Sequence, residues 1–67
     1  MITNDGELKA TQERLVRFQN QVAHLRGVEA NPENYRASAS GFLAEIDRMQ
    51  LEIREYLRSH PSERSAA

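Results

Sequence analysis

The sequence contains no cysteine and no tryptophan, and its 67 residues include only three glycines and two prolines. Without cysteine, the chain can form neither a disulfide nor a thiolate metal site. A chain this short buries only about 60% of the surface that its unfolded form exposes, so its own core gives marginal stability. Small scaffolds without disulfides or a metal depend on regular helix packing or on another subunit.

An excess of charge of one sign is also absent, since nine basic and ten acidic side chains give a net charge of −1. This balance lacks the electrostatic signature of a protein that binds nucleic acid or an anionic membrane. No apolar run approaches the ~20 residues that span a bilayer. The first residues lack the basic start and apolar stretch of a secretory signal. We expect a cytoplasmic protein without direct contact to nucleic acid or membrane.

The sequence does contain a hydrophobic heptad on each side of a short break. Apolar residues spaced by three and four positions form a seam along one side of a helix, and a seam needs a partner. The first seam comprises Leu8, Leu15, Phe18, Val22 and Leu25, with Thr11 as its polar member. The second comprises Tyr35, Ala39, Phe42, Ile46, Met49, Ile53 and Tyr56. These seams predict an all-α fold, an antiparallel two-helix hairpin that resembles a coiled coil.

Cap residues predict where the two helices begin. Asn4 and Glu7 have the spacing of a capping box. Because Gly6 weakens the first turn, Thr11 is an alternative cap and start of the first helix. Asn31 followed by Pro32 gives a cap and then a proline at the first helical position. Glycine often follows a helix end in the left-handed conformation, so Gly27 is expected to end the first helix.

These signals divide the chain into a hairpin and a tail. We predict a first helix over about 4–27, a connection over 28–32 and a second helix over about 32–59. Pro61 follows the second helix and prevents its continuation. Residues 1–60 therefore form one hairpin, and we expect residues 61–67 to be a flexible tail.

The heptads also predict a register, because position a of one antiparallel helix stacks on position d of the other. A short connection favours layers that run in order from the connection to the open end. The layers are Leu25 with Ala39, Val22 with Phe42, Phe18 with Ile46, Leu15 with Met49, Thr11 with Ile53 and Leu8 with Tyr56. In this register Arg14 lies near Glu52 and forms an exposed ion pair with it.

Four aliphatic residues outside the seams gather on one flank of the hairpin: Val16, Ala23, Leu43 and Leu57. Contiguous apolar surface generally marks an interaction site. We interpret this strip as the interface of a homodimer, which makes a four-helix bundle, or as the docking face of another protein. The alternative is that these residues are scattered surface aliphatics, which are common.

No residue pattern in the chain indicates catalysis or metal binding. His24 has Asn20 and Val28 four residues away, and neither is a usual zinc ligand. His60 precedes a proline, at the end of a helix, where a cation suits the helix dipole. The acidic residues of the second helix alternate with arginines at salt-bridge spacing. We therefore expect no enzyme, no cofactor, no metal and no small-molecule substrate.

Short motifs in both helices carry a family resemblance. The opening Met1-Ile2-Thr3-Asn4 is followed by Arg14-Leu15-Val16-Arg17-Phe18, and the second helix carries Glu52-Ile53 with Tyr56 three residues on. Over residues 1–58 the chain resembles the N-terminal helical hairpin of small bacterial Xre-type helix-turn-helix regulators and antitoxin-associated proteins. In that family the hairpin precedes a DNA-binding domain, and these 67 residues carry no such domain. The resemblance implies an element of assembly or partner docking, and it assigns no catalytic or base-reading residue.

We therefore predict a non-enzymatic protein–protein interaction or oligomerisation module whose partner is a second copy or another protein, with a dimer favoured. The alternative is a transcriptional-regulator or antitoxin-like component that acts with a DNA-binding partner.

Overall fold

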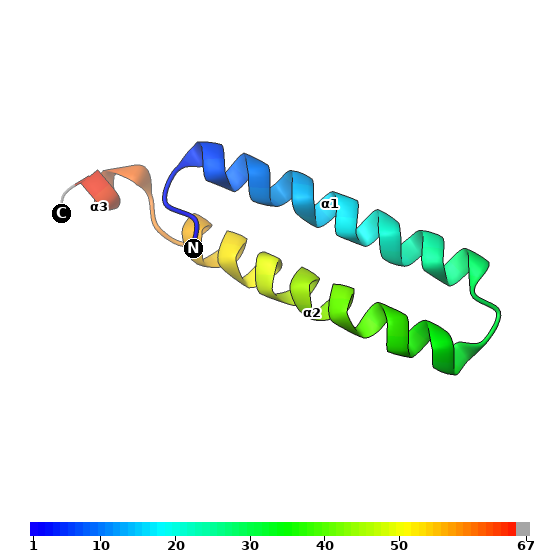
Figure 1. Cartoon of the computed structure of the whole chain (residues 1–67). Coiled ribbons are helices and arrows are strands. Elements are labelled where there is room, and N and C mark those ends of the chain that lie inside the picture. Colours follow the sequence, from blue (N-terminus) through cyan, green and yellow to red (C-terminus); the bar gives the residue numbers. More distant parts are fainter. Residues whose placement is uncertain (66–67) are drawn as a thin grey trace.

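The computed structural model describes the backbone of residues 1–65 and the side chains of residues 1–63. Helix α1 spans Asp5–Val28, α2 spans Pro32–Leu57, and a short helix α3 spans Pro61–Ser65. The two long helices lie side by side and antiparallel, joined at one end by a three-residue connection (Figure 1). The end with this connection is called the loop end here, and the other is the open end. The predicted fold class, an all-α two-helix hairpin, is confirmed.

Both predicted N-terminal caps are present. The Asn4 side-chain oxygen accepts a hydrogen bond from the backbone N–H of Glu7 at 2.8 Å. The Asn31 side-chain oxygen accepts from the N–H groups of Glu33 at 2.9 Å and Asn34 at 3.2 Å. These bonds satisfy donors that the first turn of each helix would otherwise leave open.

The helix ends within one residue of the predicted position, but the predicted left-handed cap at Gly27 is wrong. Gly27 lies inside α1, and no described glycine has a positive φ. The helix ends after Val28 because Glu29 takes an extended conformation with φ −91° and ψ 112°. The Glu29 N–H still donates to the carbonyl of Leu25 at 2.9 Å, and its carboxylate accepts from the N–H of Asn31 at 3.0 Å. A left-handed glycine is therefore not needed at this turn.

The tail also differs from the prediction. Residues 61–65 form α3 instead of a flexible segment, while residues 66 and 67 lie outside the described part of the chain. His60 caps this turn, since its Nδ1 atom accepts from the Ser62 N–H at 3.1 Å. The Glu63 carboxylate accepts from the His60 N–H at 3.3 Å, which completes a reciprocal cap. His60 thus begins a helix, where we predicted that it ends one.

The core is small and lies between the two long helices. Its buried members are Ile2, Val22, Ala39, Ile46 and Met49. Half-buried seam residues pack around them: Leu15, Phe18, Leu25, Tyr35 and Phe42. Ile2 belongs to neither heptad. It comes from the segment before α1, which runs back across the open end toward α2 (Figure 1).

The predicted register is wrong by about one helical turn. The rings of Phe18 and Phe42 pack edge to face with their centroids 5.6 Å apart, whereas we expected Phe18 to face Ile46. Helical side chains lean toward their own N-terminus, so these two rings lean in opposite directions along the hairpin. Such rings meet only if Phe42 lies level with Phe18 or somewhat nearer the open end, whereas the predicted register places Phe42 about a turn nearer the loop end.

A second contact supports the same shift. The Tyr56 hydroxyl donates to the Asp5 carboxylate at 2.6 Å, whereas the prediction placed Tyr56 beside Leu8. In both contacts, the residue of α1 meets a residue of α2 that lies nearer the loop end than the partner we predicted for it. The short connection is the cause, because it sets the end of α1 level with the start of α2.

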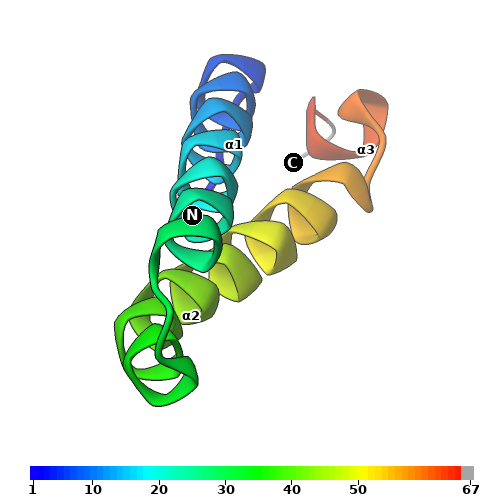
Figure 2. The same ribbon diagram turned by 90° about the vertical axis from the view of Figure 1, so that its right-hand side faces the viewer.

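The hairpin is a single layer of two helices. The principal extents of the chain, with α3 included, are 52 × 16 × 12 Å. Viewed from the loop end, α1 and α2 are inclined to each other, and α3 lies beyond the far end of α2 (Figure 2). Both broad faces of this layer therefore meet solvent.

Candidate interaction surface

The four predicted strip residues are all exposed. The exposed fraction is 53% for Val16, 44% for Leu43 and 59% for Leu57, and Ala23 is exposed as well. On α2, Leu43 and Leu57 each come one residue after a seam residue. On α1, Val16 and Ala23 lie on the same side of the hairpin as these leucines, but further round the helix from the seam. We call the broad side that carries these four residues the aliphatic face.

The corrected register decides which members of the aliphatic face lie close together. Because the Phe18 and Phe42 rings are in contact, Val16 and Leu43 lie within about a turn of each other near the middle of the hairpin. Ala23 lies nearer the loop end, and Leu57 lies near the open end. The structure thus supplies one central aliphatic pair and two outlying members.

Polar residues around this central pair are mostly uncharged. Helical spacing places four exposed uncharged side chains and one exposed charged one, Asp47, on the aliphatic face near its middle. The uncharged residues are Gln12, Gln19, Ser40 and Gln50. The other charged residues of this face lie toward its two ends. Depletion of charge at the centre is typical of the core of a protein–protein interface.

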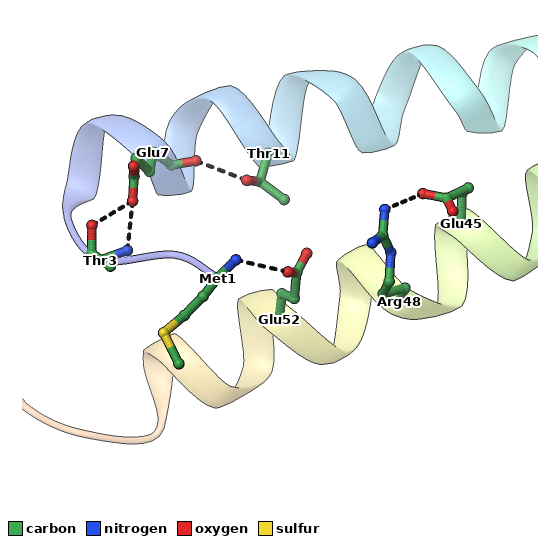
Figure 3. Close-up of polar contacts among 7 residues, drawn as sticks. All are labelled: Met1, Thr3, Glu7, Thr11, Glu45, Arg48 and Glu52. Atoms are coloured by element: carbon green, nitrogen blue, oxygen red, sulfur yellow. Dashed lines mark hydrogen bonds and ion pairs between the residues drawn. The ribbon is translucent and has the colours of Figure 1, made fainter.

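The opposite face is charged, and we call it the charged face. Its charged residues on α1 and α2 include Glu7, Arg14, Glu45, Arg48 and Glu52, whereas its half toward the loop end carries Gln21, Asn34 and Ser38. Arg48 pairs with Glu45, and the amino group of Met1 lies 3.2 Å from the Glu52 carboxylate (Figure 3). A third ion pair, of 3.3 Å, joins Arg58 to Glu55 along α2.

The predicted ion pair between Arg14 and Glu52 is not formed in the described structure, where Glu52 pairs with the Met1 amino group instead. The register shift explains this difference. It moves Arg14 toward the loop end relative to α2, away from Glu52 and toward Glu45.

Glu7 organises the polar contacts at the start of α1. One of its carboxylate oxygens accepts from the Thr3 N–H at 2.7 Å and from the Thr3 hydroxyl at 2.6 Å (Figure 3). The hydroxyl bond is the main reason that the pKa of Glu7 lies below its usual value, and the backbone bond lowers it further. These contacts hold the segment before α1 in place, and Ile2 in that segment is buried.

Sequence reasoning missed the exposure of Val28 and Leu51 and a groove near the loop end. Val28 and Leu51 are exposed by 64% and 49%, but helical spacing places neither on the aliphatic face. A groove of about 430 Å³ opens near the loop end, on the side of the charged face. Its lining residues are Asn20, Gln21, His24, Leu25, Ser38 and Phe42. The heptad pattern could have indicated this groove, because Leu25 and Phe42 both occupy position d, at the edge of the seam.

Within residues 1–63, no group of three or more His, Asp or Glu side chains is arranged to hold a metal ion. Among the same residues, every buried side-chain nitrogen and oxygen has a hydrogen-bond partner. His24 is exposed at the groove. Neither of the long helices is apolar enough over its length to cross a membrane.

Comparison with known proteins found no match among family models, curated proteins or solved structures. The resemblance to Xre-type regulators therefore stays a prediction.

Proposed function

We propose that this chain is a non-enzymatic protein–protein interaction module that self-associates through the aliphatic face. The observation that carries the proposal is the difference between the two broad sides of one thin hairpin. Near the middle of the hairpin, one side exposes Val16 and Leu43 among mostly uncharged residues, while the other exposes acidic and basic residues, several of them in ion pairs. Exposed aliphatics with little charge around them favour association over solvation.

The amount of exposed surface supports the same proposal. The chain exposes 5211 Å². A compact folded protein of 7.7 kDa exposes about 4,300 Å². The excess of about 900 Å² is close to the ~800 Å² that each partner buries in a standard protein–protein interface. A second hairpin on one broad face would bring the surface per chain to that of an ordinary globular protein.

Light scattering coupled to gel filtration tests this proposal. We expect the wild-type chain to have the mass of an oligomer at micromolar concentrations. Val16→Glu and Leu43→Glu place a charge in the middle of the aliphatic face, so each should shift the mass toward that of the monomer. Circular dichroism of each variant shows whether the helices are retained.

Two matched variants serve as controls. Val28→Glu and Leu51→Glu introduce the same charge at residues that are exposed to a similar extent but lie off the aliphatic face. Both should keep the wild-type mass. A wild-type chain that remains monomeric at millimolar concentration would contradict self-association, and equal effects of all four variants would contradict the assignment to this face.

A further inference from the structure

We infer that the groove near the loop end binds one amphipathic helix of another protein, whose acidic end lies toward the middle of the hairpin. The groove opens on the side of the charged face, opposite the aliphatic face. Self-association through the aliphatic face therefore leaves the groove open. Binding in the groove goes beyond the proposed function and does not depend on it.

The position of the groove suits a helix. Side chains of both long helices line it along the seam: Asn20, Gln21, His24 and Leu25 of α1, and Ser38 and Phe42 of α2. Leu25 and Phe42 are only half-buried there. The short helix α3 lies beyond the far end of α2 and does not cover them (Figure 2). A helix laid between α1 and α2 buries both side chains, as amphipathic helices do in apolar grooves.

Charge is scarce around the groove. Among the described residues, no aspartate, glutamate, lysine or arginine lines it. Further toward the loop end, the same side of the hairpin carries Asn34 and Val28, and 64% of Val28 is exposed. Uncharged residues around half-buried apolar ones are typical of the centre of a protein–protein interface. The part of the partner that enters the groove is therefore apolar.

Arginines lie next to the groove, toward the middle of the hairpin. Arg14 and Arg17 each come seven residues before a groove residue of α1, Gln21 and His24. They therefore lie on the same side of α1, about two turns nearer the open end. Arg48 of α2 lines a pocket together with Arg14.

Two of these arginines are available to a partner. Glu45 pairs with Arg48, whereas Arg14 and Arg17 are exposed and form no ion pair within residues 1–63. A partner helix whose apolar stripe fills the groove places its next turns over Arg14 and Arg17. Opposite charges across an interface favour the complex, so this end of the partner helix is acidic.

Exposed aliphatics of the chain itself do not match this description. Val16 and Leu43 lie among the uncharged residues of the aliphatic face. Leu51 lines a pocket with Asp47 and Arg54, whose charges are opposite. Neither group provides an apolar stripe that leads into an acidic turn, so another protein fits the groove better than a second copy.

Calorimetric titration with two synthetic peptides tests the inference. Each peptide has about 18 residues, long enough for a helix, with leucine at helical spacing on one side and alanine and glutamine elsewhere. The first turn carries glutamate in one peptide, where acids suit the helix dipole, and glutamine in the other. We expect both to bind, and the glutamine peptide to bind about 5- to 10-fold more weakly.

A double variant separates the contact with arginine from the helix propensity of the peptides. Arg14→Gln combined with Arg17→Gln should reduce the difference between the two peptides to about twofold or less, because any effect on the free peptides is the same for both proteins. Arg26→Gln combined with Arg36→Gln is the matched control. These two arginines are exposed on the other side of the hairpin, so the difference should remain.

A substitution in the groove tests where the peptides bind. Ser38→Arg places a long charged side chain in the groove and should weaken binding of the glutamate peptide at least about 10-fold. Ser40→Arg makes the same change two residues away, at an exposed position that does not line the groove, and should keep the wild-type affinity. Circular dichroism of each variant shows whether the helices are retained.

Three results would overturn the inference. They are absence of peptide binding, binding that survives Ser38→Arg, and a difference between the peptides that survives loss of Arg14 and Arg17. A lower oligomer mass of Ser38→Arg in light scattering would show that a second copy fills the groove, which also overturns it. A monomeric wild-type chain contradicts only the proposed function.

Discussion

At the scale of single residues, Glu7 gives a prediction about pH. Its hydrogen bonds from Thr3 lower its pKa from the usual 4.5. Because the folded-state pKa lies below the unfolded one, this stabilisation is complete above the unfolded value and is lost as the pH falls through the folded one. An NMR titration of the Glu7 carboxyl should therefore give a pKa below 4.5.

Thr3→Ala is the matched variant for this titration. It removes the hydroxyl donor but keeps the backbone N–H, so the pKa of Glu7 should move part of the way back to 4.5. A Glu7 carboxyl with the same pKa in both proteins would contradict the role given to the Thr3 hydroxyl.

Ile2 is the residue whose importance is least visible in the sequence. It is 5% exposed, although it precedes both helices. Truncation to Ile2→Ala should lower the free energy of unfolding by about 2 kcal/mol, because the lost side chain leaves part of the core open at that end. Leu51→Ala removes a similar volume from an exposed site and should change the free energy of unfolding by less than about 0.5 kcal/mol. Chemical denaturation followed by circular dichroism measures both, and equal effects would be inconsistent with a buried Ile2.

At the scale of the helices, the three glycines differ in a testable way. Apart from the neighbouring backbone of its own helix, a Cβ atom added at Gly27 or Gly41 would meet no atom within 4 Å. Both lie inside helices, so Gly27→Ala and Gly41→Ala should each stabilise the protein by about 0.5–1 kcal/mol. A Cβ at Gly6 would lie 3.2 Å from the Asn4 oxygen that caps α1. Gly6→Ala should therefore stabilise the protein less than the other two substitutions, or not at all. Thermal unfolding of the three variants measures this difference in stability.

The helices also show how much a heptad pattern can predict. The spacing of apolar residues correctly gave the helix faces that meet, and Asn4 and Asn31 gave both helix starts. The axial register was not predictable from spacing, because successive layers of a heptad are chemically alike. The register depends on where α1 ends, and this in turn depends on the backbone conformation of Glu29.

The same limits apply to the candidate surface. Spacing identified Val16, Ala23, Leu43 and Leu57 as exposed aliphatics on one flank. It did not show that Val16 and Leu43 lie within about a turn of each other, because that follows from the register. Periodicity also gave no signal for Ile2, because Ile2 lies outside both helices. It becomes buried only because the segment before α1 folds back across the open end.

At the scale of the whole molecule, the central fact is a thin hairpin with a small core. Among residues 1–63, five side chains are buried, while the aromatic seam residues Phe18 and Phe42 stay half-buried. A single layer of this size depends on further burial for its stability. We therefore expect the folded state to be coupled to association, as in other small proteins whose core is completed by a partner.

The most direct test of this account is the dependence of thermal unfolding on protein concentration, followed by circular dichroism from about one to several hundred micromolar. If folding is coupled to dimer formation, mass action requires the unfolding midpoint to rise steadily with concentration. The Val16→Glu variant should lose this dependence and unfold at a lower temperature. A wild-type midpoint that stays constant over the whole range would contradict the claim that the hairpin associates with a second copy.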